Sequence, residues 1–240
     1  RSPIPIRRDA GVVGRLAFSG RMLGDLQLLT CTRFLRPLLS CMRGSVLDVG
    51  CGEMPFRSLL PEGARYTGID VPAADDFGMR RHAEIVPFDG MTIPFPDASF
   101  DHVLCTEVLE HAEDPVRLVA EMARVLRPGG TLAATVPFAA RVHHAPYDFH
   151  RFTRFRLLSM FAGFADVEVE ERGDDIAVIA NKLIVLSMRL ADRRHPLRWP
   201  WLLPVLPAAA AALVFAHASL RFGWGSKADP LGYGVVARKA

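Results

Sequence analysis

The chain has 240 residues, half of them hydrophobic and 23% charged, with a formal net charge of +3. A charge this close to balance excludes the overall basic field of nucleic-acid-binding proteins, so no nucleic-acid partner is expected. The hydrophobic share is high for a soluble chain of this size and indicates an apolar segment in addition to an ordinary core.

The four cysteines form no CxxC pair and no spacing typical of metal ligands; they are Cys31, Cys41, Cys51 and Cys105. This usage favours a reducing compartment. From Arg1 onwards the sequence shows no apolar run and cleavage site of a secretory signal, so a cytoplasmic location is expected.

Composition divides the chain into three zones. Residues 1–44 mix leucines with arginines, and LQLLTCTRFLRPLL (26–39) can place its leucines on one face, which predicts a helical N-terminal appendage. Residues 45–174 alternate short apolar runs with helical segments, and the end of the chain, 230–240, returns to a strand pattern. Residues 175–229 form a hydrophobic helical insertion between these two parts.

The middle zone predicts an α/β fold with a mostly parallel sheet built from βαβ units. Its expected strands are SVLDVG (45–50), ARYTGID (64–70), EIVPFDG (84–90), DHVLCTEV (101–108), GTLAATVP (130–137) and DVEVEE (166–171). The amphipathic segment PVRLVAEMARVL (115–126) is expected to be a helix that stops at the following RPGG.

Acids and glycines gather where these strands end. In open α/β sheets, ligands bind at the carboxyl ends of the strands. Gly50 and Gly52 allow the backbone to approach a ligand, and Asp70 ends the next strand, where an acid can accept hydrogen bonds from ribose hydroxyls. Because GCGEMP has neither GxGxxG spacing nor a following GK[ST], a nucleoside without a pyrophosphate is expected.

An ordered set of motifs carries a family resemblance. VLDVGCG, YTGID, IPFPDASFDHVLCTEVLEHAEDPVRLVAEMARVLRPGG and TLAATVP resemble the class I S-adenosylmethionine-dependent methyltransferases, and GCGEMPFR is similar to the GCGxxP(Y/F)R form seen in some of them. Many members carry a third glycine where this chain has Met54.

The resemblance implies a Rossmann-like, doubly wound, seven-stranded sheet with an antiparallel last strand, here GYGVVARK (232–239), and S-adenosylmethionine as cofactor. It implies that the glycine turn contacts the methionine portion and ribose, that Asp70 holds the ribose hydroxyls, that the segment after the third strand borders the adenine, and that the end of the fourth strand flanks the amino acid end. The cofactor-binding residues expected in this way are Asp48, Gly50, Cys51, Gly52, Asp70, Asp89, Gly90, Met91, Thr106 and Glu107.

The segment VHHAPYDFHRFT (142–153) follows the fifth strand and is the candidate catalytic segment. His144 or His150, oriented by Asp148, is expected to act as a general base, because imidazole titrates near neutrality. Pairing of Asp148 with Arg151 to fix the loop is one alternative, and a zinc or iron site is another. We expect no metal, because no HExxH-type spacing appears.

Glu110 and His111 are adjacent, so on a helix they would point about 100° apart and need not cooperate. A role in opening the helix for the acid and a packing role for His111 are expected.

The insertion contains two apolar stretches. IAVIANKLIVLSMRL (176–190) is the first, and residues 199–220 form a second that lacks Asp, Glu, Lys and Arg. The second is long enough to cross a bilayer, but Pro200, Pro204 and Pro207 are expected to break its first half.

Because the last strand is expected to return to the same sheet, a single crossing would leave it on the wrong side of a membrane, so a membrane-bound insertion must either re-enter or lie on the surface. The insertion is expected either to lie on the cytoplasmic face of a membrane through residues 176–224, with its arginines and tryptophans at the rim, or to cover the substrate cleft or a homodimer interface.

The expected function is therefore methyl transfer to a hydroxyl of a small, apolar, glycan or lipid-linked acceptor. Methyl transfer to a carbon of a quinone-like ring is an alternative. A cofactor-binding scaffold without turnover is a rival of another class.

Overall fold

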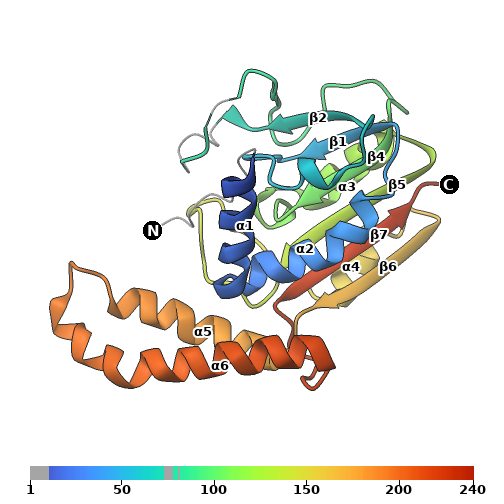
Figure 1. The fold of residues 1–240 in the computed structure, drawn as a ribbon. Coiled ribbons are helices and arrows are strands. Elements are labelled where there is room, and N and C mark those ends of the chain that lie inside the picture. Colours follow the sequence, from blue (N-terminus) through green and yellow to red (C-terminus); the bar gives the residue numbers. More distant parts are fainter. Residues whose placement is uncertain (1–10, 73–77, 81) are drawn as a thin grey trace.

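The computed structural model describes residues 11–72, 78–80 and 82–240. Within them the chain forms a seven-stranded sheet in the order β3-β2-β1-β4-β5-β7-β6 (Figure 1). The strands are β1 (Ser45–Val49), β2 (Arg65–Asp70), β3 (Val86–Pro87), β4 (Phe100–Thr106), β5 (Leu126–Pro137), β6 (Asp166–Arg172) and β7 (Gly232–Arg238).

The first five strands run parallel, and β7 runs antiparallel to both β5 and β6. The Rossmann-like, mostly parallel sheet with an antiparallel last strand is therefore confirmed. The inner strand β1 is buried along its whole length, as expected for a parallel strand covered on both faces. The third strand is much shorter than the segment 84–90 that the sequence predicts.

One face of the sheet is covered by α3 (Pro115–Val125), whose start is capped by Asp114 with Pro115 in the first turn. The helix ends at Val125, one residue before the predicted end, and β5 begins at Leu126, so that RPGG lies in the first part of the strand. Its apolar side joins a core with the inward residues of the sheet and with α4 (Arg154–Met160); examples are Leu118, Met122 and Leu157, all buried.

The opposite face is covered by α2 (Leu26–Leu39), with α1 (Val12–Gly24) beside it (Figure 1). Leu28, Leu35 and Leu39 pack with Val46 of β1 and Leu104 of β4 in a second core cluster. The N-terminal helices thus complete the second layer on the sheet.

Two helices form a hairpin that projects from the sheet: α5 (Asp175–Leu190) and α6 (Leu202–Phe222), joined at the far end through a 3-10 segment, Pro196–Trp201 (Figure 1). The base of the hairpin packs on the core, where Ala177, Ala180 and Ala216 meet Leu26 and Leu231. Further out, much of the apolar surface is exposed; Leu197 and Leu203 are 93% and 81% exposed.

The expectation that prolines break this segment was wrong. Pro200 lies in the 3-10 segment, Pro204 falls in the first turn of α6, and Pro207 lies inside a continuous helix. A proline in the first turn loses no intrahelical hydrogen bond, so only Pro207 disturbs the helix. The run Pro196–Phe222 is long and apolar enough to span a membrane, and 17% of its most apolar window is buried.

Candidate active site

The glycine turn after β1 is fixed to the neighbouring strand. The amides of Gly50 and Cys51 both donate to the Ile69 carbonyl of β2, at 2.9 and 3.1 Å. Gly50 has φ +68°, and a Cβ there would lie 2.4 Å from Val108, so no other residue fits. The Cys51 side chain is buried against Gly68, and burial raises the pKa of its thiol; this residue can therefore meet a ligand only through its backbone.

Asp70 closes the turn at the end of β2. Its carboxylate oxygens accept the amides of Gly52 and Val71, each at 2.7 Å, and these amides oppose the rise in pKa that burial causes. Each oxygen keeps a second lone pair. Asp70 can therefore hold the turn and still accept hydrogen bonds from a diol.

Asp48 lies beneath the turn and is 3% exposed. The Tyr66 hydroxyl donates to its Oδ2 at 2.7 Å. Burial raises the pKa of Asp48 to about 7, the hydrogen bond from Tyr66 lowers it, and the Asp70 charge raises it. The sequence analysis missed Tyr66 as a site residue, although Tyr66 belongs to the predicted strand ARYTGID (64–70).

Asp89, Gly90 and Met91 form a turn at the end of β3. The exposed Asp89 carboxylate accepts the amides of Thr92 and Met91, which lower the pKa of Asp89, and Gly90 has φ +83°. The amide of Phe88 donates to the Asp70 carbonyl, so this turn lies beside the end of β2.

Thr106 and Glu107 end β4 on the same edge of the sheet. The Thr106 Oγ1 atom is buried and has no hydrogen-bond partner among the described residues. Glu107 has φ +54° and accepts from the buried Arg172 guanidinium at 2.7 Å. Arg172, which sequence reasoning did not single out, thereby fixes the Glu107 side chain.

The loop after β5 differs from the expected arrangement. The Asp148 carboxylate pairs with Arg151, which is the alternative that the sequence left open, and it also accepts the His143 amide at 2.8 Å. The His150 Nε2 donates to the Ala112 carbonyl at 3.1 Å, which ties this ring to the loop. The loop thus places the His143 backbone next to the acid.

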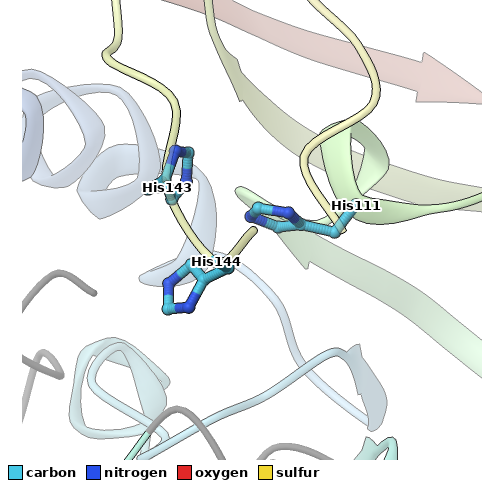
Figure 2. Close-up of side chains that lie close together, drawn as sticks. All are labelled: His111, His143 and His144. Carbon is cyan, nitrogen blue, oxygen red and sulfur yellow. The ribbon is translucent and has the colours of Figure 1, made fainter. Parts of the chain in front are cut away.

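Three imidazoles converge instead at His111, His143 and His144 (Figure 2). His111 ends the short 3-10 helix Leu109–His111, and the other two come from the loop after β5. The Phe149 and His150 amides donate to the Glu110 carbonyl and hold this loop on the helix. The sequence analysis did not single out His143 as a site residue. It expected only a packing role for His111, which lies in this cluster.

Glu110 lies directly against this cluster and is fully buried. Burial and the Glu107 charge raise its pKa well above the usual range. Glu110 lies in the first turn of the 3-10 helix Leu109–His111, and its side chain is buried without a hydrogen-bond partner among the described residues. Besides the adjacent His111, it lies near His143, a residue distant in sequence, and no local pattern reveals this contact.

A groove of about 450 Å³ lies between the loop after β5 and α5. Its lining combines basic and apolar side chains: Arg141, Val142, Asn181, Lys182, Val185, Leu186 and Arg189. Its lining residue Val142 directly precedes His143 in the chain.

Comparison with known proteins finds methyltransferases similar to the central part of the chain. The sequence model described as "Methyltransferase domain" matches residues 47–134. The chain is 39% identical over 99 residues to 27-O-demethylrifamycin SV methyltransferase of Amycolatopsis mediterranei, a match that covers 37% of this chain and 36% of that protein.

Two further relatives have the same partial coverage. Ubiquinone biosynthesis O-methyltransferase of Sodalis glossinidius is 38% identical over 96 residues (36% of this chain, 38% of that protein). Sterol 24-C-methyltransferase ERG6B of Gibberella zeae is 38% identical over 96 residues (35% and 25%). The matches thus span less than half of these curated relatives.

Solved structures extend the likeness in fold to most of the chain. A SAM-dependent methyltransferase from Archaeoglobus fulgidus superposes with a TM-score of 0.53 at 17% identity, covering 94% of this chain and 99% of that one. The [4+2]-cyclase SpnF superposes with a TM-score of 0.55 at 24% identity, covering 89% and 82%.

Proposed function

We propose that this chain is a class I S-adenosylmethionine-dependent methyltransferase that transfers a methyl group to a hydroxyl of a small, apolar or lipid-linked acceptor; the match of residues 47–134 to a methyltransferase domain supports this. The observation that carries the proposal is the convergence of the glycine turn, Asp70 and Thr106 at the carboxyl ends of β1, β2 and β4. Among the described residues at this edge, acids and a buried hydroxyl suit a nucleoside and an amino acid better than a pyrophosphate.

The residues present fit the cofactor. Asp70 offers free lone pairs to ribose hydroxyls, and the turn Asp89–Gly90–Met91 would border the adenine. The unsatisfied Thr106 hydroxyl would gain a partner from the amino acid end, which removes the cost of leaving it buried and unpaired. Glu107, held by Arg172, would flank that end.

S-adenosylmethionine supplies a methyl group that its sulfonium already activates, so the chain must orient the acceptor, exclude water and remove a proton. The acceptor O–H loses its proton to a base, and the oxygen bonds to the methyl carbon as the carbon–sulfur bond breaks. Of the two expected bases, His144 is the better candidate, because the His150 Nε2 is bonded to Ala112.

The basicity of His144 favours an acidic hydroxyl. Burial, with His143 and His111 nearby, lowers its pKa to about 4, so the ring is neutral at pH 7 but is a weak base. A phenol, with a pKa of about 10, gives up its proton far more easily than an alcohol. A ring-borne hydroxyl is therefore the acceptor we favour, and the ubiquinone-related relative acts by O-methylation according to its name.

The hairpin supports an apolar acceptor met at a membrane surface. Its far end carries exposed Leu197, Trp199 and Trp201 beside the arginines 193, 194 and 198. Aromatic rings and basic side chains together suit the interface of an anionic bilayer. We propose that the hairpin binds the cytoplasmic face of a membrane peripherally, which would bring the groove near lipid-linked substrates; dimer formation through the hairpin is the competing outcome.

The decisive experiment is calorimetric titration of the purified chain with S-adenosylmethionine and S-adenosylhomocysteine. Micromolar binding is expected, and Asp70→Ala should weaken it by about 100-fold, since two hydrogen bonds to a charged acceptor contribute about 1.5 kcal/mol each. Asp97→Ala, an exposed acid in a surface pair with Arg124, serves as the matched control and should bind like the parent.

Two results would count against the proposal. Absence of binding in a folded sample would favour a scaffold, and unchanged affinity in Asp70→Ala would show that the ribose lies elsewhere. Once binding is established, transfer from ¹³C-methyl-labelled cofactor to phenolic acceptors identifies the product, because oxygen-bound and carbon-bound methyl groups differ in chemical shift. A carbon-bound methyl would replace O-methylation by C-methylation.

A further inference from the structure

The three imidazoles of the site lie close together (Figure 2). One ring nitrogen from each of His111, His143 and His144 lies within 4.8 Å of the other two. Their ring centroids are 4.8 to 5.3 Å apart. All three side chains are partly exposed, so an ion from solution can reach them.

A buried carboxylate lies beside this cluster. Glu110 has no exposed surface, and neither of its oxygens has a hydrogen-bond partner among the described residues. Its Oε1 lies 3.6 Å from the His111 Nε2 and 3.9 Å from the His143 Nε2, which is too far for hydrogen bonds. A buried, unpaired carboxylate is costly, and a cation between these atoms would satisfy it.

The backbone fixes which ring nitrogens are available. The His111 Nδ1 contacts the Tyr147 carbonyl, and the His143 Nδ1 contacts the Arg141 carbonyl at 3.0 Å. A carbonyl only accepts, so each Nδ1 carries the proton and each Nε2 keeps its lone pair on the side of Glu110. Metal-binding histidines are held in this way, with one nitrogen on a carbonyl and the other on the ion.

We propose that His111, His143, His144 and Glu110 form a binding site for one zinc-like divalent transition metal ion. Imidazole nitrogens favour such ions over magnesium or calcium, which prefer oxygen ligands. In a tetrahedral site with bonds of about 2.0–2.2 Å, the donor atoms are about 3.4 Å apart. The separations of the Glu110 Oε1 from the His111 and His143 Nε2 atoms need to close by a few tenths of an ångström, and the His144 ring needs a side-chain rotation to bring its nitrogen to the same ion.

The ion would sit between the end of β4 and the loop that leads to the groove. If the proposed methyl transfer is correct, an ion here would bind the acceptor oxygen and lower the pKa of its hydroxyl, releasing the proton to solvent. His144 would then act as a ligand in place of a base. This role rests on the proposed function, whereas metal binding itself does not.

The test measures metal binding without activity. Tag-free protein, with the exposed Cys41 changed to Ser in every variant, is stripped with a chelator and titrated with zinc against a chromophoric competitor. One equivalent per chain is expected, with micromolar or tighter affinity. His143→Ala, His144→Ala and Glu110→Gln should each weaken binding by about 10- to 100-fold, whereas the matched control His195→Ala, an exposed histidine of the hairpin, should bind like the parent.

A second readout uses the unsubstituted protein in case a variant fails to fold. Zinc should protect His111, His143 and His144 from diethylpyrocarbonate, as located by mass spectrometry, and leave His195 reactive. Absence of a stoichiometric site, or equal weakening in the control, would overturn the proposal. Because cofactor titration of the stripped protein is a separate measurement, failure of the metal site and failure of methyltransferase function can be distinguished.

Discussion

At the scale of single residues, Met54 stands in a backbone position that favours glycine. Its φ is +52°, in the turn where many members of the resembled family have a third glycine. A left-handed conformation costs a side-chain-bearing residue about 1–2 kcal/mol, and the greater entropy of glycine in the unfolded chain offsets part of this. Met54→Gly should raise the free energy of unfolding in urea by about 0.5–1 kcal/mol.

The control for this substitution is Met188→Gly. Met188 is exposed near the end of α5, where glycine should instead destabilise the helix by roughly 0.5–1 kcal/mol. Destabilisation by Met54→Gly of the same size would show that the turn does not strain the methionine.

Asp48 predicts a pH dependence of stability. Its pKa is raised from 3.8 to about 7 in the folded chain, so the folded state keeps a proton that the unfolded chain has lost. The stability from this group is complete below its unfolded pKa and is lost as the pH rises through about 7, by at most about 1.4 kcal/mol per pH unit.

Comparison with Asp48→Asn isolates this contribution, because Glu110 and Asp70 titrate in the same direction and His144 in the opposite one. The difference in unfolding free energy between parent and variant should change steadily between pH 4 and pH 8 in urea melts. A constant difference would mean that Asp48 ionises at its ordinary pKa.

The residues of the site differ in how far the nearby sequence predicts their positions. Gly50, Gly52 and Asp70 could be predicted because strand ends and positive-φ turns leave marks in the nearby sequence. Glu110, His111 and His143 could not be assembled, because they meet through an irregular loop whose path depends on hydrogen bonds to the Glu110 carbonyl. For the same reason no local pattern shows that the Asp148 carboxylate accepts the His143 amide.

At the scale of elements, Arg172 joins four parts of the fold. From β6 its buried guanidinium donates to the Tyr233 carbonyl of β7, the Val136 carbonyl of β5 and the Glu107 carboxylate after β4, and it contacts Cys31 of α2. Arg172→Met should lower the unfolding free energy by about 3–5 kcal/mol, because Glu107 and two buried carbonyls lose their donor.

The pair of Arg154 with Glu171 is the matched comparison on the same part of the sheet. The Arg154 side chain is 43% exposed, so Arg154→Met should cost less than about 1–2 kcal/mol in the same urea experiment. Equal losses in the two variants would refute a special structural role for Arg172.

Element type was predictable wherever one periodic pattern dominated, as in α2 and β5. The effect of a proline on a helix depends on its position, which the sequence pattern did not give for the hairpin. The 3-10 segment Pro196–Trp201 makes α6 begin at Leu202, so Pro204 lies in the first turn of the helix, where a proline is tolerated. The third strand is short: only two residue pairs join it to β2.

At the scale of the whole molecule, the hairpin projects from the α/β domain (Figure 1). Its outer part exposes large apolar side chains. An apolar surface of this extent marks a contact with a membrane or another protein. Membrane binding and self-association depend differently on charge. An anionic bilayer attracts the basic tip of the hairpin, which carries arginines 193, 194 and 198, whereas two copies of this tip repel each other.

Flotation with anionic vesicles therefore tests the membrane proposal. Changing arginines 193, 194 and 198 together to Gln should lower the partition coefficient by about 100-fold at low salt, since each arginine near the surface contributes about 1 kcal/mol. The matched control changes three exposed arginines on the body of the domain, Arg65, Arg117 and Arg156, to Gln, so that its net charge equals that of the tip variant. Equal losses in both variants would indicate a non-specific charge effect.

The aromatic residues at the tip separate insertion from simple electrostatic attraction. Trp199→Ser with Trp201→Ser should reduce binding at high salt, where the arginines are screened but burial of apolar surface persists. Light scattering in the absence of lipid measures whether the chain is a monomer or a dimer. A monomer that floats with vesicles supports the membrane surface, whereas a dimer that dissociates in the tryptophan variant and never floats would assign the hairpin to self-association.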